Sequence, residues 1–193
     1  MVGSEKAEPD FGSQVVKALE FEDVQSDIAD FRQYFDKQPD HNLRLTVEVN
    51  DLPRWIVMMM EVDTLFVPPM EWNDAMPMMN WLSSGEQVDW VLLDEDTGRK
   101  SMDINWNWKV GDVVKIRIFN DPKSFHPMNH PFHIHGQRFL VTEMDGQANP
   151  NMAWKDTQII PVGSTVELLV DVTNPGKWMA HCHIAEHLHA GMM

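Results

Sequence analysis

The sequence predicts an all-β domain, an antiparallel β-sandwich or barrel, over most of the chain. Three segments carry the signal, because residues 43–49, 113–119 and 165–172 alternate aliphatic with polar side chains. A period of two is typical of half-buried strands, whose successive side chains point to opposite faces. Turn sequences rich in Gly, Pro, Asn and Asp punctuate the chain at 94–98, 120–122, 144–146, 161–164 and 174–176. Short strands between such turns favour a sandwich.

The N-terminal part of the chain has a different pattern. It is acidic, contains no histidine before residue 41, and repeats apolar residues at helical spacing within 23–35, which predicts a short amphipathic helix. Pro39 then interrupts the pattern. We therefore expect residues 1–41 to form a linker or the tail of a preceding domain, and residues 42–193 to form the β domain.

Composition excludes several classes of function. A length of 193 residues with 43% hydrophobic content suits one globular domain. The formal net charge of −15 disfavours nucleic acid as a partner, since phosphate binding needs clustered Lys and Arg. No apolar run is long enough for a membrane span. The single cysteine, Cys182, cannot form an intrachain disulfide.

Histidine is concentrated near the C-terminal end. Eight of nine histidines follow residue 125, and six of them lie in HPFHIHG (130–136) and HCHIAEH (181–187). Cys182 lies within the second motif, and Met192 follows five residues after that motif ends. Such a concentration of soft-metal donors predicts a metal centre. His41 lies far from these motifs, and we expect it to be a surface or linker residue.

Extended backbone would divide these donors between two sites. In a strand, Cys182 points to the face opposite that of its neighbours His181 and His183. His133 and His135 are likewise two residues apart and share a face. One short stretch can therefore serve two sites in opposite directions.

The two donor sets differ in chemistry. The first joins a thiol, two imidazoles and a thioether: Cys182, His130, His187 and Met192. This combination is typical of a blue-copper electron-transfer site. The second comprises the four remaining imidazoles of the motifs: His133, His135, His181 and His183. All-imidazole sets suit copper, iron or zinc. Structural zinc is the main alternative, but it favours several cysteines and has little use for an axial methionine.

At these residues the sequence resembles the multicopper oxidases, which include laccases and cuprous oxidases. HPFHIHG is similar to their H-P-x-H-x-H-G motif, and HCHIAEHLHAGM to their H-C-H-x-x-x-H-x-x-x-x-M motif. The resemblance covers roughly residues 42–193. It implies a cupredoxin-like Greek-key β-sandwich, the last cupredoxin domain of such an oxidase. It also implies a periplasmic or extracellular location.

The resemblance further implies a copper ligand set. The type 1 copper site would consist of His130, Cys182, His187 and, axially, Met192. The type 2 ligand would be His133, and the type 3 ligands would be His135, His181 and His183. In this family a reducing substrate gives electrons singly to type 1 copper. They pass through Cys182 to His181 and His183, and O₂ is reduced to water at the trinuclear cluster.

The family's trinuclear cluster uses eight histidines, four of them from a separate cupredoxin domain. The two motifs here supply four, so we expect a partner: another cupredoxin domain, a second polypeptide, or another copy in a homo-oligomer. The resemblance implies phenols, aromatic amines or metal ions as substrates. The methionines of 58–79 are consistent with Cu(I) as a substrate. If so, removal of Met76, Met78 and Met79 should lower activity on Cu(I) but not on phenols. The alternative function is an isolated copper-binding electron-transfer module without oxidase activity.

Four further residues beside the motifs are weaker candidates. His126 and His189 fill no ligand position of the family, and supporting or solvent-exposed roles are expected for them. Asp156 is a candidate for orienting a neighbouring group or contacting substrate. Glu186 is a candidate for proton supply.

Overall fold

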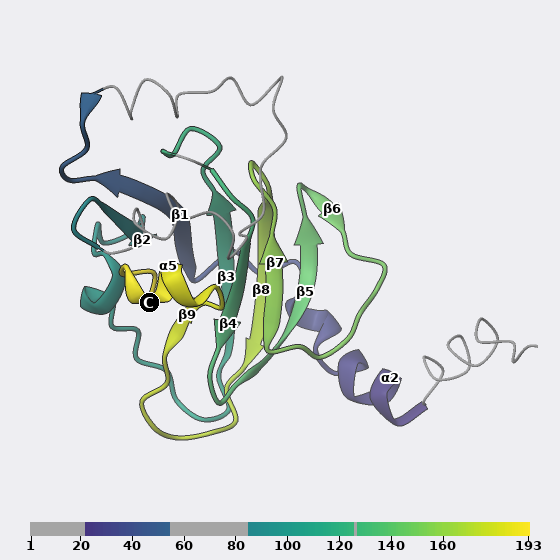
Figure 1. Ribbon diagram of the computed structural model, residues 1–193. Coiled ribbons are helices and arrows are strands. Elements are labelled where there is room, and N and C mark those ends of the chain that lie inside the picture. The colour runs from purple at the N-terminus through teal and green to yellow at the C-terminus, as the bar shows by residue number, and fades with distance from the viewer. Residues whose placement is uncertain (1–21, 55–84, 126) are drawn as a thin grey trace, which may run out of the picture. The chain divides into compact units, whose positions relative to one another are not determined.

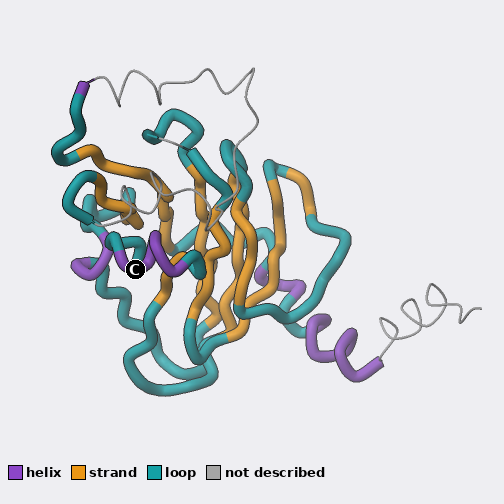
Figure 2. Tube along the Cα trace, in the orientation of Figure 1, coloured by secondary structure: helices purple, strands orange, loops and turns teal. Residues whose placement is uncertain are grey.

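The computed structural model of the protein describes residues 22–54, 85–125 and 127–193 (Figures 1 and 2). His126 and the methionine-rich segment 58–79 lie outside the described residues. The chain divides into two compact units, residues 1–35 and 36–193. Among the described residues, no helix is long and apolar enough to cross a membrane.

The described part of the first unit is helical. It contains α2 (Glu22–Ala29) and a short 3₁₀-helix, η1 (Arg32–Tyr34). The helix predicted within 23–35 is therefore confirmed, although it is interrupted before Arg32.

The described strands of the second unit form two sheets. The larger has the order β2-β1-β3-β8-β5-β6 and the smaller the order β7-β4-β9. The large-sheet strands are β1 (His41–Val49), β2 (Val88–Asp94), β3 (Val113–Asn120), β5 (Arg138–Met144), β6 (Gln147–Ala148) and β8 (Thr165–Asp171). The small-sheet strands are β4 (His130–Ile134), β7 (Thr157–Ile160) and β9 (Ala180–Cys182), and the helices of this unit are η2 (Ser101–Asp103) and α5 (Ala185–His189). The three strands predicted from alternation are confirmed as β1, β3 and β8.

One strand pair departs from the antiparallel expectation. β1 and β3 pair in parallel, with Leu43 opposite Ile118, whereas the other pairs are antiparallel. The parallel pairing follows from the strand order, because β2 runs antiparallel along one side of β1. The chain then passes β1 and adds β3 on its other side, after two reversals of direction.

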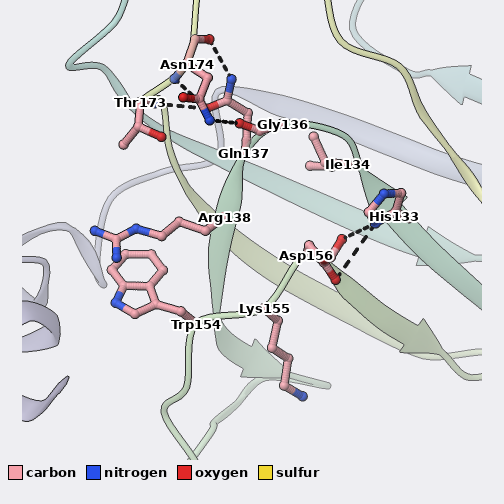
Figure 3. Close-up of a pocket in the computed structure, with 10 residues that line it drawn as sticks. All are labelled: His133, Ile134, Gly136, Gln137, Arg138, Trp154, Lys155, Asp156, Thr173 and Asn174. Atoms are coloured by element: carbon pink, nitrogen blue, oxygen red, sulfur yellow. Dashed lines mark hydrogen bonds and ion pairs between the residues drawn. The ribbon is translucent and has the colours of Figure 1, made fainter.

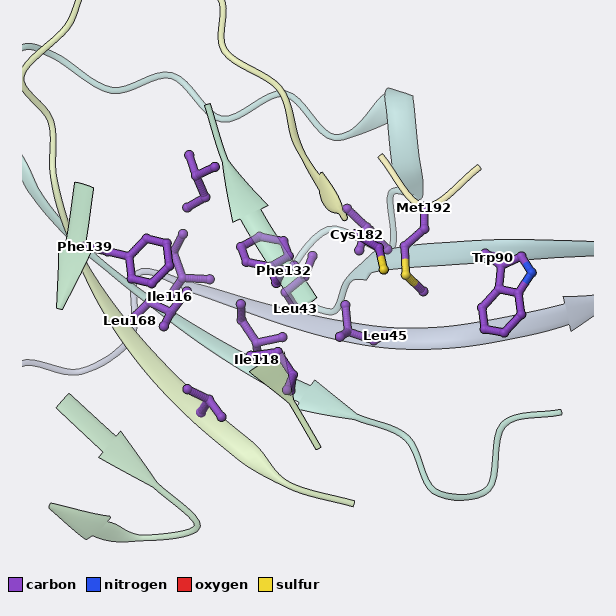
Figure 4. Packing of buried hydrophobic residues seen from close by; sticks show 14 of the residues in the cluster. Leu43, Leu45, Trp90, Ile116, Ile118, Phe132, Phe139, Leu168, Cys182 and Met192 are labelled. Atoms are coloured by element: carbon purple, nitrogen blue, oxygen red, sulfur yellow. The ribbon is translucent and has the colours of Figure 1, made fainter. Parts of the chain in front are cut away.

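The hydrophobic core lies between the two sheets (Figure 4). The small sheet contributes Phe132, Ile134, Ile160 and Cys182, and the large sheet contributes, among others, Leu43, Ile116, Phe139 and Leu168. Each of these side chains is at most 3% exposed. The predicted β-sandwich is therefore confirmed, and Cys182 lies in its core.

Candidate metal centre

The first donor cluster is buried and compact. Cys182 Sγ lies 3.6 Å from the Nδ1 atoms of both His130 and His187, and these two nitrogens are 3.2 Å apart. Nitrogen and sulfur donors lie about 2.0 and 2.3 Å from a bound metal, so in a tetrahedral site two nitrogens lie about 3.3 Å apart and a nitrogen and a sulfur about 3.5 Å apart. The three atoms therefore fit around a single metal ion.

Backbone and side-chain hydrogen bonds position His130. It opens β4 opposite Ile160 of β7. The buried Asn120 side chain donates to the carbonyls of Met128 and Ile160, at 2.8 and 2.9 Å. These bonds connect the segment just before His130 to the strand position opposite it, and His130 is 2% exposed.

The C-terminal segment returns to the same place. Cys182 ends β9, and its N–H donates to the carbonyl of Met192 at 3.1 Å. The Met192 N–H donates to the carbonyl of His187 at 2.9 Å. The Met192 side chain is fully buried, and Figure 4 shows it beside Cys182. All four residues of the first set thus converge.

The strand expected through the second motif is shorter than the motif. It ends at Cys182, a bend follows, and α5 begins at Ala185. The helix places His187 on the same side as Cys182, whereas a strand would have carried it away. His183 lies in the bend, yet its ring remains 5.8 Å from that of His181.

Burial sets the charge state of this cluster. It lowers the pKa of His130 to about 3. It also raises the pKa of the Cys182 thiol to about 12, although a hydrogen bond from the Ile184 backbone acts in the opposite direction. The cluster therefore favours a neutral imidazole and a protonated thiol until a cation displaces the thiol proton.

Trp90 of β2 also belongs to this cluster, although no sequence motif had indicated it. Its ring stacks on the imidazole of His187 with centroids 3.6 Å apart and meets His130 edge-on at 5.5 Å. The available signal was a large aromatic residue in the segment 88–94, which is mostly apolar, and nothing in that segment indicated a histidine partner.

The second cluster contains the other four imidazoles. The Nε2 atoms of His135 and His181 are 2.9 Å apart, and the His133 ring lies 4.7–5.5 Å from the rings of the other three. His133, His135 and His181 each offer a nitrogen within 4.8 Å of the others. His133 and His135 are half-buried and His183 is exposed, so this cluster lies at the surface.

Backbone carbonyls orient two of these rings. The Nδ1 atom of His133 lies 2.8 Å from the carbonyl oxygen of Asp156, and that of His181 lies 2.7 Å from the carbonyl oxygen of Cys182. A carbonyl can only accept, so Nδ1 carries the proton and Nε2 keeps its lone pair. Histidines that bind metals are typically held in this way. The orienting group expected at Asp156 is thus its backbone carbonyl.

A surface cavity of about 540 Å³ adjoins the second cluster (Figure 3). His133 and Asp156 line one side, and Arg138, Trp154 and Asn174 line the other. The Arg138 guanidinium lies 4.0 Å above the Trp154 ring. The cavity leaves the His133 side of the cluster open to solvent.

The remaining candidates lie outside both clusters. His189 is exposed at the end of α5, and Glu186 is half-buried in the first turn of that helix. His41 is half-buried at the start of β1, where it stacks on Trp106 with centroids 4.2 Å apart. It is a structural residue of the strand, not part of a linker.

Comparison with known proteins identifies the family. The multicopper oxidase family model matches residues 74–193. A multicopper oxidase from Staphylococcus epidermidis is 43% identical over 92 residues, which are 47% of this chain and 21% of that protein. Laccase-1 from Melanocarpus albomyces is 26% identical over 185 residues, covering 82% of this chain and 26% of the laccase.

Solved structures agree with the fold. A multicopper oxidase from Campylobacter jejuni, described as a metallo-oxidase, superposes with a TM-score of 0.51 and 25% sequence identity. The match covers 81% of this chain and 29% of that one. The chain thus spans about a quarter or less of the curated relatives. The family match, the cupredoxin-like sandwich and the clustered donors show that the chain belongs to the multicopper oxidases, whose cofactor is copper.

Proposed function

We propose that residues 42–193 are the C-terminal, type 1 copper-bearing domain of a laccase-like multicopper oxidase. The observation that carries the proposal is the pair of donor clusters on opposite sides of β9. The buried cluster contains the only thiol, and the half-exposed cluster contains only imidazoles. This separation suits an enzyme that takes electrons at one site and uses them at another.

Each residue has a defined role in this proposal. His130, Cys182 and His187 hold type 1 copper, with Met192 as the axial ligand. His133 is assigned to type 2 copper, and His135, His181 and His183 are assigned to the type 3 pair. Bound copper would supply one-electron oxidation of the substrate at the first site and four-electron reduction of O₂ to water at the second.

The protein connects the two sites through β9. Cys182 is joined covalently to His181 on one side and to His183 on the other. The hydrogen bond from His181 Nδ1 to the Cys182 carbonyl, at 2.7 Å, adds a shorter route between them. The sandwich core around Cys182 excludes water from the first site. Apolar surroundings of this kind tune the redox potential of a bound metal.

Completion of the second site requires further imidazoles. We propose that another cupredoxin domain or chain supplies them, which includes a second copy in a homo-oligomer. The half-exposed cluster and the neighbouring exposed side chains of Trp178 and Met179 support this, since both leave surface for a partner to cover. Phenols, aromatic amines and metal ions remain the proposed substrate classes.

The second candidate function is an electron-transfer module that binds copper without reducing O₂. It is favoured by the second cluster, because four imidazoles are half of a trinuclear site. Loading the chain with copper and measuring visible absorption, copper content and O₂ uptake separates the two functions. Thiolate-to-copper absorption with one copper per chain and no O₂ uptake supports the module.

Several coppers per chain with O₂ uptake on a phenol or on Cu(I) support the oxidase. The oligomeric mass of the same sample shows whether other copies supply the missing ligands. A colourless, zinc-containing protein would contradict both functions.

A further inference from the structure

Trp90 is a common support for both histidines of the first cluster. Its indole stacks nearly parallel to the His187 imidazole, at 3.6 Å between centroids and 14° between planes. The same indole meets the His130 ring edge-on, at 5.5 Å and 69°. It is 2% exposed, so its position is fixed by the core of the sandwich. One side chain therefore limits the orientation of both rings.

The backbone of Trp90 holds the same segment. Its N–H donates to the carbonyl of Ala190 at 2.9 Å, directly after α5. A side chain at Gly191 would place its Cβ 3.2 Å from the Trp90 carbonyl oxygen, and Gly191 has φ +110°. The chain between His187 and Met192 is thus packed closely against β2.

This support matters because α5 is too short to hold itself. It has five residues, and no side chain caps its N-terminus. Isolated helices of this length are unstable in water, so tertiary contacts must fix it. Its contact with β2 passes through Trp90, whereas Cys182 and His130 lie on strands of the small sheet.

Trp90 contacts the histidines through its ring and not through a hydrogen bond. The buried indole Nε1 has no hydrogen-bond partner among the described residues. A hydrogen-bonding function would be lost completely in phenylalanine, but a stacking function is partly kept. Replacing Trp90 with phenylalanine or with leucine therefore distinguishes a stacking function from a hydrogen-bonding function.

We infer that Trp90 is a positioning residue for the type 1 copper site, holding the imidazoles of His187 and His130 with their Nδ1 atoms toward Cys182. This inference rests on the proposed copper binding at that cluster. Groups that orient metal ligands typically contribute roughly 10- to 100-fold to metal affinity. Loss of the indole should therefore weaken copper binding and change the geometry that gives the thiolate-to-copper absorption.

The test compares Trp90→Leu and Trp90→Phe with the unchanged chain. Copper affinity is measured by competition with a chelator, and the site geometry by visible absorption and electron paramagnetic resonance. We expect Trp90→Leu to lower copper affinity roughly 10- to 100-fold. Trp90→Phe should lower it by a smaller factor, because it retains an aromatic ring, and both should shift the spectrum.

Trp106→Phe is the matched control. Trp106 also stacks on a histidine, His41, with centroids 4.2 Å apart, but belongs to neither donor cluster. This variant should keep the copper affinity and spectrum of the unchanged chain. If circular dichroism shows that Trp90→Leu does not fold, the copper affinity and spectrum of Trp90→Phe alone test the role of Trp90.

Two failures can be told apart. Unchanged affinity and spectrum in folded Trp90 variants, with normal absorption in the parent chain, would overturn the role of Trp90. Absence of thiolate-to-copper absorption in the parent chain, or its persistence in Cys182→Ser, would instead overturn the copper site itself.

Discussion

Cys182 and His181 are neighbours in β9, yet their side chains belong to different clusters. Cys182 Sγ lies 3.6 Å from His130 Nδ1, whereas His181 Nε2 lies 2.9 Å from His135 Nε2. The pleat of the strand is the cause, since successive side chains point to opposite faces. Two metal sites can therefore share one strand and be connected by its covalent bonds.

Cys182→Ser tests the separation of these sites. A hydroxyl is a poor substitute for a thiolate at copper, so the thiolate-to-copper absorption should disappear. The imidazole cluster lies on the other face and should keep its copper binding. Visible spectroscopy with copper analysis checks both outcomes. His189→Ala removes an exposed histidine outside both clusters and should change neither quantity. Loss of copper from both clusters in Cys182→Ser would contradict their independence.

Gly136→Ala should disturb the second cluster. Gly136 has φ +65°, and an added Cβ would collide with the Trp178 indole. The N–H of the neighbouring His135 donates to the Met179 carbonyl at 2.9 Å. A displaced Trp178 would therefore disturb this hydrogen bond and with it the position of His135. We expect a loss of about 1–2 kcal/mol from the backbone conformation and about 1–3 kcal/mol more from overpacking. Urea unfolding measures the sum.

Gly146→Ala separates the two contributions. Gly146 has φ +75°, close to that of Gly136, but an added Cβ would meet nothing within 4 Å. It should therefore show only the backbone cost. Equal losses in the two variants would mean that Trp178 yields freely and does not hold the loop.

Part of the fold could be read from the sequence because some strands have two different faces. β1 buries one set of alternating residues and was predicted. β8 is buried on both faces, but it was predicted because the polar residues Glu167 and Asp171 lie among its apolar ones. β2 and β5 were not, since Val91 and Leu92 are both buried, as are Phe139, Leu140 and Val141. A strand that packs apolar side chains on both faces shows no alternation. The five residues of α5 are likewise too few to reveal a helical period.

The sequence likewise predicted some features of the two donor clusters but not others. The spacing within each motif predicted which donors share a face, because local geometry decides it. The convergence of His130 with Cys182 depends on the pairing of β4 with β9, and the contact of Trp90 with His187 depends on how β2 meets the C-terminal segment. Those are contacts between segments far apart in sequence, which a single sequence does not specify.

Glu167→Gln should strongly destabilise the sandwich. The Glu167 carboxylate of β8 forms an ion pair with Lys115 of β3, with Oε2 2.5 Å from Nζ, and both side chains are 4% exposed. Breaking such a pair leaves a buried charge and typically costs about 3–5 kcal/mol. Glu48→Gln breaks the exposed pair with Lys100 and should cost at most about 1 kcal/mol. Chemical unfolding of both variants at neutral pH measures the difference, and similar small losses would contradict the importance of the buried pair.

The Glu167 pair also predicts acid sensitivity. Burial alone would raise the pKa of Glu167, but hydrogen bonds from Lys115 and Arg117 outweigh it and lower that pKa below its usual value of 4.5. A carboxylate with a lowered pKa stabilises the fold fully above its unfolded-state pKa, and this stabilisation is lost as the pH falls through the folded-state value. The free energy of unfolding of the parent chain should therefore decline below about pH 4.5 more steeply than that of Glu167→Gln. Parallel curves for the two proteins would contradict the shift.

His41 predicts a second pH dependence, at higher pH. Burial lowers the pKa of His41 from 6.5, although nearby aspartates, Asp94 above all, act in the opposite direction. The neutral ring accepts a hydrogen bond from Trp108 Nε1 at 3.1 Å, and such a bond contributes about 1 kcal/mol. Because the folded-state pKa is the lower one, this stabilisation is complete above about pH 6.5 and declines as the pH falls toward the folded-state value.

His41→Phe isolates this contribution. Phenylalanine keeps a ring against Trp106 but can neither bind a proton nor accept the Trp108 hydrogen bond. The variant should be less stable than the parent at pH 8, and the gap between them should narrow as the pH falls below about 6.5. Other titrating groups are common to both proteins and cancel in the difference. A gap that stays constant from pH 8 to pH 5, measured by urea unfolding, would show that His41 does not titrate differently in the folded chain.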